Sequence, residues 1–143
     1  MFKKIFNKEK KENLNNKNTL VAALLIHAAK IDENYTDIEK KIIKEALINL
    51  SNMSLDQVEK LMEHAENIEE ESNQIVEFTR EVKKYPMEFR LKIIEIIWKI
   101  VYSDGTSDSY ESNLIRRICG LLYVTSKDSG IIKTKVQDVL NKK

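Results

Sequence analysis

Two stretches of helical length are apolar around almost their whole circumference. Nine of the ten residues from 20 to 29 are apolar, with His27 as the exception. The same character returns from 91 to 101, after Pro86 and before an acidic turn at 103–105. A helix that is apolar on all sides is buried rather than laid on a surface. We therefore expect helices over 19–31 and 87–103 to pack against each other in the core.

Turn-forming residues are scarce, because the 143-residue chain contains three Gly and one Pro. A sandwich or barrel needs a turn about every ten residues, so the scarcity of these residues argues against both folds. The remaining segments have apolar residues at spacings of three and four, which is typical of amphipathic helices. The sequence predicts a single all-α domain of about seven helices over 18–143. The amphipathic segments lie at about 36–50, 54–69, 71–84, 108–123 and 127–141.

Charge is nearly balanced overall but unevenly distributed. The 24 Lys and Arg residues against 23 acids give a net charge of +1, which argues against a nucleic-acid binder. Residues 32–71, however, hold twelve acids and four Lys. The Glu run over 59–71 predicts a solvated helix face, with a docking surface for a basic partner as the alternative.

The few thiol and imidazole groups exclude several kinds of site. A single cysteine, Cys119, excludes an internal disulfide, and two isolated histidines exclude the His/Cys spacings of zinc sites. We expect His27 to be packed or paired, His64 to face solvent and Cys119 to be a buried thiol. No stretch of eighteen uncharged apolar residues occurs, so we expect a cytoplasmic protein.

The segment 1–17 differs from the rest of the chain. It carries six Lys and two Glu, and places Phe2, Ile5 and Phe6 on one helical face. That chemistry suits a helix lying on an anionic membrane surface, although a basic solvated leader explains it equally well. We expect any peripheral contact with the inner face of the membrane to lie in this segment.

Capping boxes mark several helix starts. In this motif a short oxygen side chain accepts from the third helical N–H, and a Glu or Gln three residues later reaches back to the cap. Thr36 with Glu39, Ser54 with Gln57, and Asp108 with Glu111 have the required spacing.

Shifting the chain by 72 residues superposes its two halves. Each half then contains an apolar helix, an acidic turn, a capped amphipathic helix and a third helix with a Ser cap. This predicts two pseudo-repeated helical units, over 20–69 and 92–141. The matched pairs are Asp32 with Asp104, Thr36 with Asp108, Glu39 with Glu111, Ile43 with Ile115, Leu50 with Leu122, Ser54 with Ser126 and Asp56 with Asp128.

This duplicated pattern resembles the TerB-like family, which is named for a tellurite-resistance protein and includes the N-terminal region of the membrane co-chaperone DjlA. The resemblance covers about 20–128 and rests on the stretch from His27 to Glu39, and on Val101 to Gly105 with Glu111. The first copy departs from the pattern, because Glu33 replaces the glycine that follows Asp104. The resemblance implies an all-helical domain, an acidic cluster suggested to bind metal, and an association with stress-related or membrane-linked complexes.

The acidic turns are the candidate site. Asp32, Glu39, Asp104, Asp108 and Glu111 lie at helix junctions, where converging carboxylates would suit a hard cation such as Ca²⁺ or Mg²⁺. Neither turn has the length of an EF-hand loop. Helix capping is one alternative, because Glu39 and Glu111 occupy third helical positions, and an acidic docking surface is another.

These patterns predict a non-enzymatic interaction domain of a stress-related or envelope-associated complex. A dedicated divalent-cation-binding protein is the alternative. We expect a protein partner and no nucleic acid, and no catalytic residue or firmly bound cofactor is assigned.

Overall fold

The computed structural model describes residues 18–30, 35–71, 75–104 and 109–141, and the side chains of residues 104, 109–112, 140 and 141 are outside this description. The described part is all-α, with seven α-helices and no strand, as the sequence predicts. The described part of the first helix covers residues 18–29. It is followed by α2 (Asp37–Ser51), α3 (Leu55–Glu71), α4 (Val76–Val82), α5 (Met87–Val101), a 3₁₀ turn (Tyr102–Asp104), α6 (Ser109–Leu121) and α7 (Ser126–Asn141).

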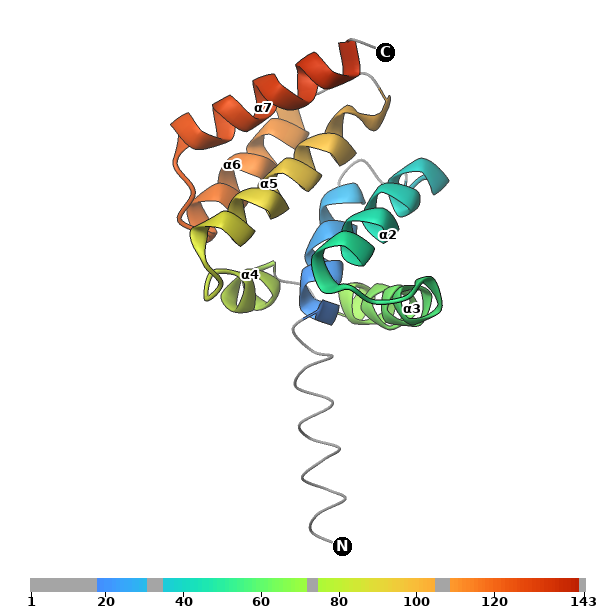
Figure 1. Ribbon diagram of the computed structural model, residues 1–143. Coiled ribbons are helices and arrows are strands. Elements are labelled where there is room, and N and C mark those ends of the chain that lie inside the picture. Colours follow the sequence, from blue (N-terminus) through green and yellow to red (C-terminus); the bar gives the residue numbers. More distant parts are fainter. Residues whose placement is uncertain (1–17, 31–34, 72–74, 105–108, 142–143) are drawn as a thin grey trace, which may run out of the picture.

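The first helix and α5 both contribute buried residues to one hydrophobic core, which confirms the burial predicted from their apolar character. Every residue from 21 to 26 is at most 2% exposed, and Ile93, Ile94 and Ile97 of α5 are fully buried. Figure 1 shows α2 and α3 beside the first helix, with α6 and α7 against α5. The helix α5 contacts α2, α6 and α7, so it joins the two halves of the fold.

The fourth helix is shorter than the predicted 71–84. It spans Val76–Val82 and is followed by a turn that leads to Pro86, which precedes the first residue of α5. Arg90 fixes this junction by donating from Nε to the carbonyl of Tyr85 (3.0 Å) and from Nη1 to the carbonyl of Leu122 (2.7 Å). The start of α5 is thereby held to the end of α6.

The helix caps are confirmed in part. The backbone N–H of Gln57 donates to Ser54 Oγ (3.3 Å), and the N–H of Ser54 donates to Gln57 Oε1 (3.0 Å), which completes the predicted capping box. The expected Ser cap on α7 is wrong. The N–H of Asp128 donates to Thr125 Oγ1 (3.1 Å), so Thr125 is the cap and Ser126 is the first helical residue.

The turns before α3 and α7 are nevertheless built alike. Asn52 and Tyr123 are the two non-glycine residues with positive φ in the described chain, at 55° and 57°. Each lies two residues before the capping residue of the next helix, Ser54 or Thr125. The two turns therefore match at an offset one residue shorter than the 72 residues that the sequence predicts. The superposition of the complete units stays a prediction.

Gly130 provides a test of the local helix energetics. It lies exposed in α7, and a Cβ added there would meet no atom within 4 Å. Because alanine loses less backbone entropy than glycine in a helix, Gly130→Ala should stabilise the fold by about 0.5–1 kcal/mol. Urea unfolding measures this change, and a loss of stability would show that the glycine relieves a contact in the folded state.

Candidate functional site

The structure describes the side chain of one of the five predicted metal ligands, so the metal site stays a prediction. Asp32 and Asp108 lie outside the described residues. Asp104 ends the 3₁₀ turn and Glu111 lies in the first turn of α6, but the positions of their side chains are not described. Among the side chains that are described, no group of three or more His, Cys, Asp or Glu is arranged to hold a metal ion.

Glu39 is the one predicted ligand whose side chain is described, and it completes a capping box. Its Oε1 accepts from the backbone N–H of Thr36 (2.8 Å) and from Thr36 Oγ1 (3.0 Å). In return, the N–H of Glu39 donates to Thr36 Oγ1 (3.1 Å). Glu39 is buried, at 6% exposure, so its carboxylate is part of the start of α2. The capping role predicted for this residue is confirmed.

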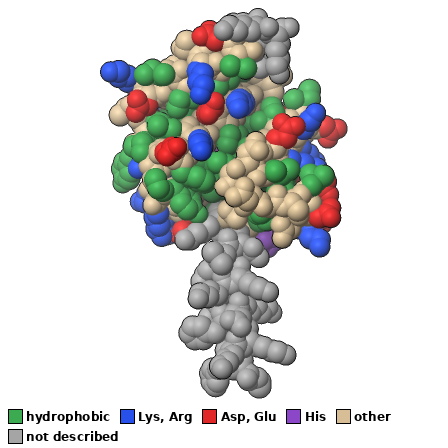
Figure 2. All heavy atoms as spheres, viewed as in Figure 1, with side chains coloured by type: hydrophobic (Ala, Val, Ile, Leu, Met, Phe, Trp, Pro, Cys, Tyr) green, Lys and Arg blue, Asp and Glu red, His purple; other side chains and the backbone are tan. Residues whose placement is uncertain are grey.

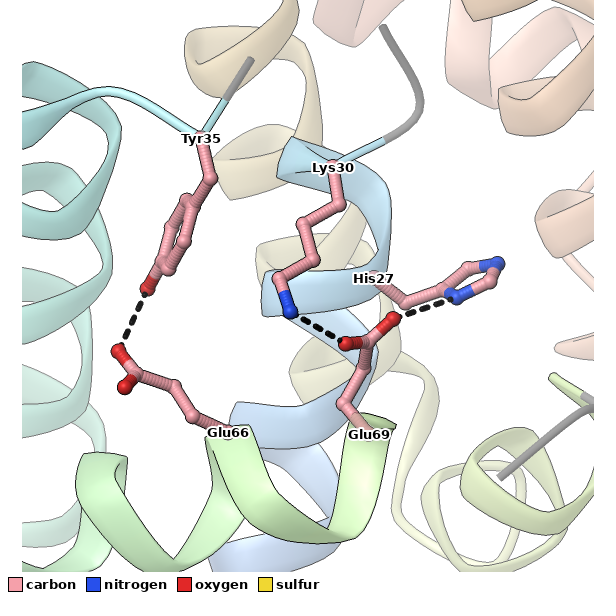
Figure 3. A network of polar contacts seen from close by, with 5 residues as sticks. All are labelled: His27, Lys30, Tyr35, Glu66 and Glu69. Atoms are coloured by element: carbon pink, nitrogen blue, oxygen red, sulfur yellow. Dashed lines mark hydrogen bonds and ion pairs between the residues drawn. The ribbon is translucent and has the colours of Figure 1, made fainter. Parts of the chain in front are cut away.

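A network of polar contacts lies beside this cap. Glu69 of α3 accepts from Lys30 Nζ through Oε2 (2.8 Å), while His27 Nδ1 lies 3.2 Å from its Oε1 (Figure 3). The Glu69 side chain is 10% exposed, compared with 28% for Lys30 and 33% for His27. One carboxylate therefore binds both polar side chains at the end of the first helix. We call His27, Lys30, Tyr35, Glu66 and Glu69 the α3 clamp.

The second arm of the α3 clamp holds the residue that leads into α2. Tyr35 donates its phenolic O–H to Glu66 Oε1 at 3.4 Å (Figure 3). Burial, followed by the charge of Glu66, raises the pKa of Tyr35 above its usual value of about 10. Lys30 and Lys40 lie over the Tyr35 ring, with Nζ 5.9 and 4.9 Å from its centroid. The clamp thus fixes both sides of the 31–34 segment to the same helix.

The expected solvated face over 59–71 needs correction at two positions. Glu59, Glu63, Glu70 and Glu71 are exposed, as predicted. Glu66 and Glu69 instead turn towards the first helix and Tyr35. Helical spacing contained a signal for this difference, because both residues continue the buried stripe of α3. That stripe consists of Val58, Leu61, Met62 and Ala65.

His27, His64 and Cys119 lie where the sequence predicts. His27 has its partner in Glu69, and His64 is exposed. Cys119 is buried, and burial raises the pKa of its thiol above the usual range. Trp98 packs in the core with its ring stacked on Tyr102, the centroids lying 5.7 Å apart.

The exposed surface agrees with the balanced composition. On the face shown in Figure 2, Lys and Arg side chains alternate with Asp and Glu, and apolar side chains lie between them. This face has no broad patch of one sign of the kind that a nucleic-acid backbone attracts. Within the part of the chain that the structure describes, no helix has the length and apolar character needed to cross a bilayer.

Comparison with known proteins places the chain in a family. The family model for the tellurite resistance protein TerB matches residues 18–134, which is most of the chain. The chain belongs to the TerB family. The match begins at the first described helix and ends within α7, so it includes the α3 clamp and both acidic turns. Neither a curated protein nor a solved structure matched the chain in the parallel searches.

Glu69→Gln tests the α3 clamp. The amide keeps the size of the side chain but removes the charge that binds Lys30 and His27, so we expect a loss of about 1–3 kcal/mol in the free energy of unfolding. The neighbouring Glu70 is exposed, and Glu70→Gln should change stability by less than about 0.5 kcal/mol. Equal urea midpoints for the two variants would show that the clamp adds no stability.

Tyr35→Phe tests the second arm through its pH dependence. Because the pKa of Tyr35 is raised in the folded state, the phenol loses its proton first in the unfolded chain. Its contribution to stability is complete below pH about 10 and declines as the pH rises further. The stability difference between the parent and Tyr35→Phe should therefore be smaller at pH 11 than at pH 8 in urea unfolding. A difference that stays constant would contradict the raised pKa, since other titrating groups are common to both proteins.

Proposed function

We propose that this TerB-family chain is a non-enzymatic interaction domain of a tellurite-resistance-like stress complex or an envelope-associated complex. In this proposal the acidic turns that contain Asp32 and Asp104 bind a divalent cation, Ca²⁺ or Mg²⁺, and the helical surface binds a protein partner. A dedicated cation-binding protein is the alternative. The family match over residues 18–134 is the observation that supports the interaction-domain proposal.

The α3 clamp supports a role for the turn after the first helix. It ties Lys30, which precedes the 31–34 segment, and Tyr35, which follows it, to glutamates of one helix. A binding turn gains affinity when its ends are fixed before the ligand arrives, because less conformational entropy is lost on binding. The clamp would supply this rigidity to the turn that carries Asp32.

The environments of His27 and Cys119 support a non-enzymatic role. The imidazole of His27 is paired with a carboxylate, and the Cys119 thiol is buried with a raised pKa. A catalytic thiol needs the opposite, a lowered pKa beside a cation or a base. These two groups therefore have structural explanations.

Cation binding is tested by thermal unfolding at fixed ionic strength. A cation that binds only the folded state should raise the melting temperature with concentration, by an amount equivalent to about 2.7 kcal/mol at one hundred times its Kd. Asp32→Asn and Asp104→Asn should each remove that increment, whereas Asp138→Asn, at an exposed position of α7, should keep it. If Ca²⁺, Mg²⁺ and Mn²⁺ give no more shift than matched monovalent salt, the cation part of the proposal fails.

A survival assay tests the biological part of the proposal. Cells that lack the chain should be more sensitive to potassium tellurite, and the parent chain should restore their growth. If Asp32→Asn and Asp104→Asn also restore growth, the domain acts without the cation. A deletion strain with unchanged tellurite survival and intact envelope would overturn the stress-complex assignment, and the dedicated cation-binding protein would remain.

A further inference from the structure

A groove runs between α6 and α7, away from the α3 clamp. Its volume is about 480 Å³, and its floor includes Trp98 of α5. One wall carries Arg116 and Gly120 from α6, and the other carries Gly130 and Lys133 from α7. We call this feature the α6–α7 groove. Its volume lies within the range of about 300–1,000 Å³ that is usual for ligand clefts.

The charged residues that line the α6–α7 groove are all cations. Arg116 and Lys133 line it, and no Asp or Glu does. Neither cation forms an ion pair with a described residue, although Lys133 Nζ lies 5.3 Å above the Trp98 ring. Arg116 and Lys133 lie near the middle of their helices, farther from the 122–125 turn that joins α6 to α7 than Gly120 and Gly130 do. Two cations on opposite walls, towards the end of the groove away from this turn, complement an anionic group.

Each wall of the groove carries one glycine, and the described structure shows no reason why the fold requires glycine there. Gly120 and Gly130 are exposed, and a Cβ added to either would meet no atom within 4 Å. Glycine inside a helix costs about 1 kcal/mol relative to alanine. The absence of a side chain does, however, permit close approach by the backbone of another molecule.

The floor of the groove is apolar and has its polar atoms satisfied. Trp98 is 5% exposed, and its indole N–H donates to Ser129 Oγ at 3.2 Å. Ile115, Cys119 and Val124 complete the apolar part of the lining. An occupant would therefore combine an anionic group at the Arg116 end with a small apolar group towards the 122–125 turn.

We propose that the α6–α7 groove binds an acidic peptide segment of a partner protein. A carboxylate of the segment lies between Arg116 and Lys133, and an adjacent small apolar residue lies over Gly120 and Gly130. This proposal rests on the interaction-domain function and names the partner chemistry of one surface. A carboxylate fits better than a phosphate group, because Thr125 already caps the start of α7 and Asp128 places a negative charge in its first turn.

Peptide binding can be followed through Trp98, the single tryptophan of the chain. The probes are four blocked eight-residue peptides with one central Glu, followed by Ala, Val, Leu or Phe, and the same four peptides with Gln in place of Glu. At least one Glu peptide should bind the full chain about tenfold or more tighter than its Gln counterpart, the ratio that corresponds to about 1.4 kcal/mol. Equal binding of every Glu and Gln pair, or no saturable binding up to millimolar concentration, would overturn the proposal.

Variants locate the binding on the groove. Arg116→Gln and Lys133→Gln should each weaken binding of the Glu peptide about tenfold, while Arg117→Gln should stay within about twofold. Arg117 is the matched control, because it is the exposed neighbour of Arg116 and does not line the groove. Gly120→Leu should also weaken binding by filling the groove, and urea unfolding of each variant verifies that it folds. An equal loss with Arg117→Gln would overturn the proposed location.

Two further outcomes separate this inference from others. Sodium acetate and sodium phosphate are tested as competitors of the Glu peptide. If either displaces the peptide with an inhibition constant equal to the Kd of the peptide, the groove takes a small anion, and the peptide proposal fails. If Arg116→Gln restores tellurite survival as fully as the parent does, the partner binds elsewhere. In that case the groove inference fails while the proposed function stands.

Discussion

The shared carboxylate of Glu69 is what allows the first helix to be buried. Residues 21 to 26 have almost no contact with solvent, so the polar groups of this helix must lie near its end and be paired. His27 and Lys30 occupy that end, and Glu69 binds both. The ammonium group of Lys30, near the C-terminus of this helix, also opposes the negative end of the helix dipole. Loss of Glu69 would leave two polar side chains partly buried, which costs more than the pair itself contributes.

The same contact sets the position of α3. The apolar stripe of α3 would permit several orientations of this helix, whereas Glu66 and Glu69 contact Tyr35 and the end of the first helix in one orientation. The α3 helix therefore uses a dual surface, with Val58, Met62 and Ala65 in the core and the two glutamates at its C-terminal end. Hydrophobic contact supplies most of the packing energy, and the α3 clamp makes this one orientation more stable than its alternatives.

The fold could be predicted from the sequence because its main signals are local. Apolar stretches, capping boxes and the lack of turn residues indicated the helices, and Thr36, Ser54 and Gln57 form the expected caps. The α3 clamp could not be predicted in the same way, since it joins residues about forty positions apart. The run of glutamates in α3 predicts a solvated helix face. Its two inward-facing members become evident only when the buried stripe of the same helix is extended to the helix end. The cap of α7 lies one residue before the predicted position because Thr125 and Ser126 are both good capping residues, and the hydrogen bond from the N–H of Asp128 to Thr125 Oγ1 distinguishes them.

The charges around Tyr35 limit how a cation could bind at the neighbouring turn. The described groups near its ring are the carboxylates of Glu39, Glu66 and Glu69 and the ammonium groups of Lys30 and Lys40, which together carry one net negative charge. Since Glu69 is already paired with Lys30 and Glu39 caps α2, recruiting either to a metal would break contacts that hold the fold. A divalent cation at this turn would consequently depend on anionic groups beyond the clamp, of which Asp32 and Glu33 are the nearest in sequence. Asparagine at position 32 would then remove a dominant part of the binding free energy while leaving the α3 clamp intact, which is why the substitution separates cation binding from capping.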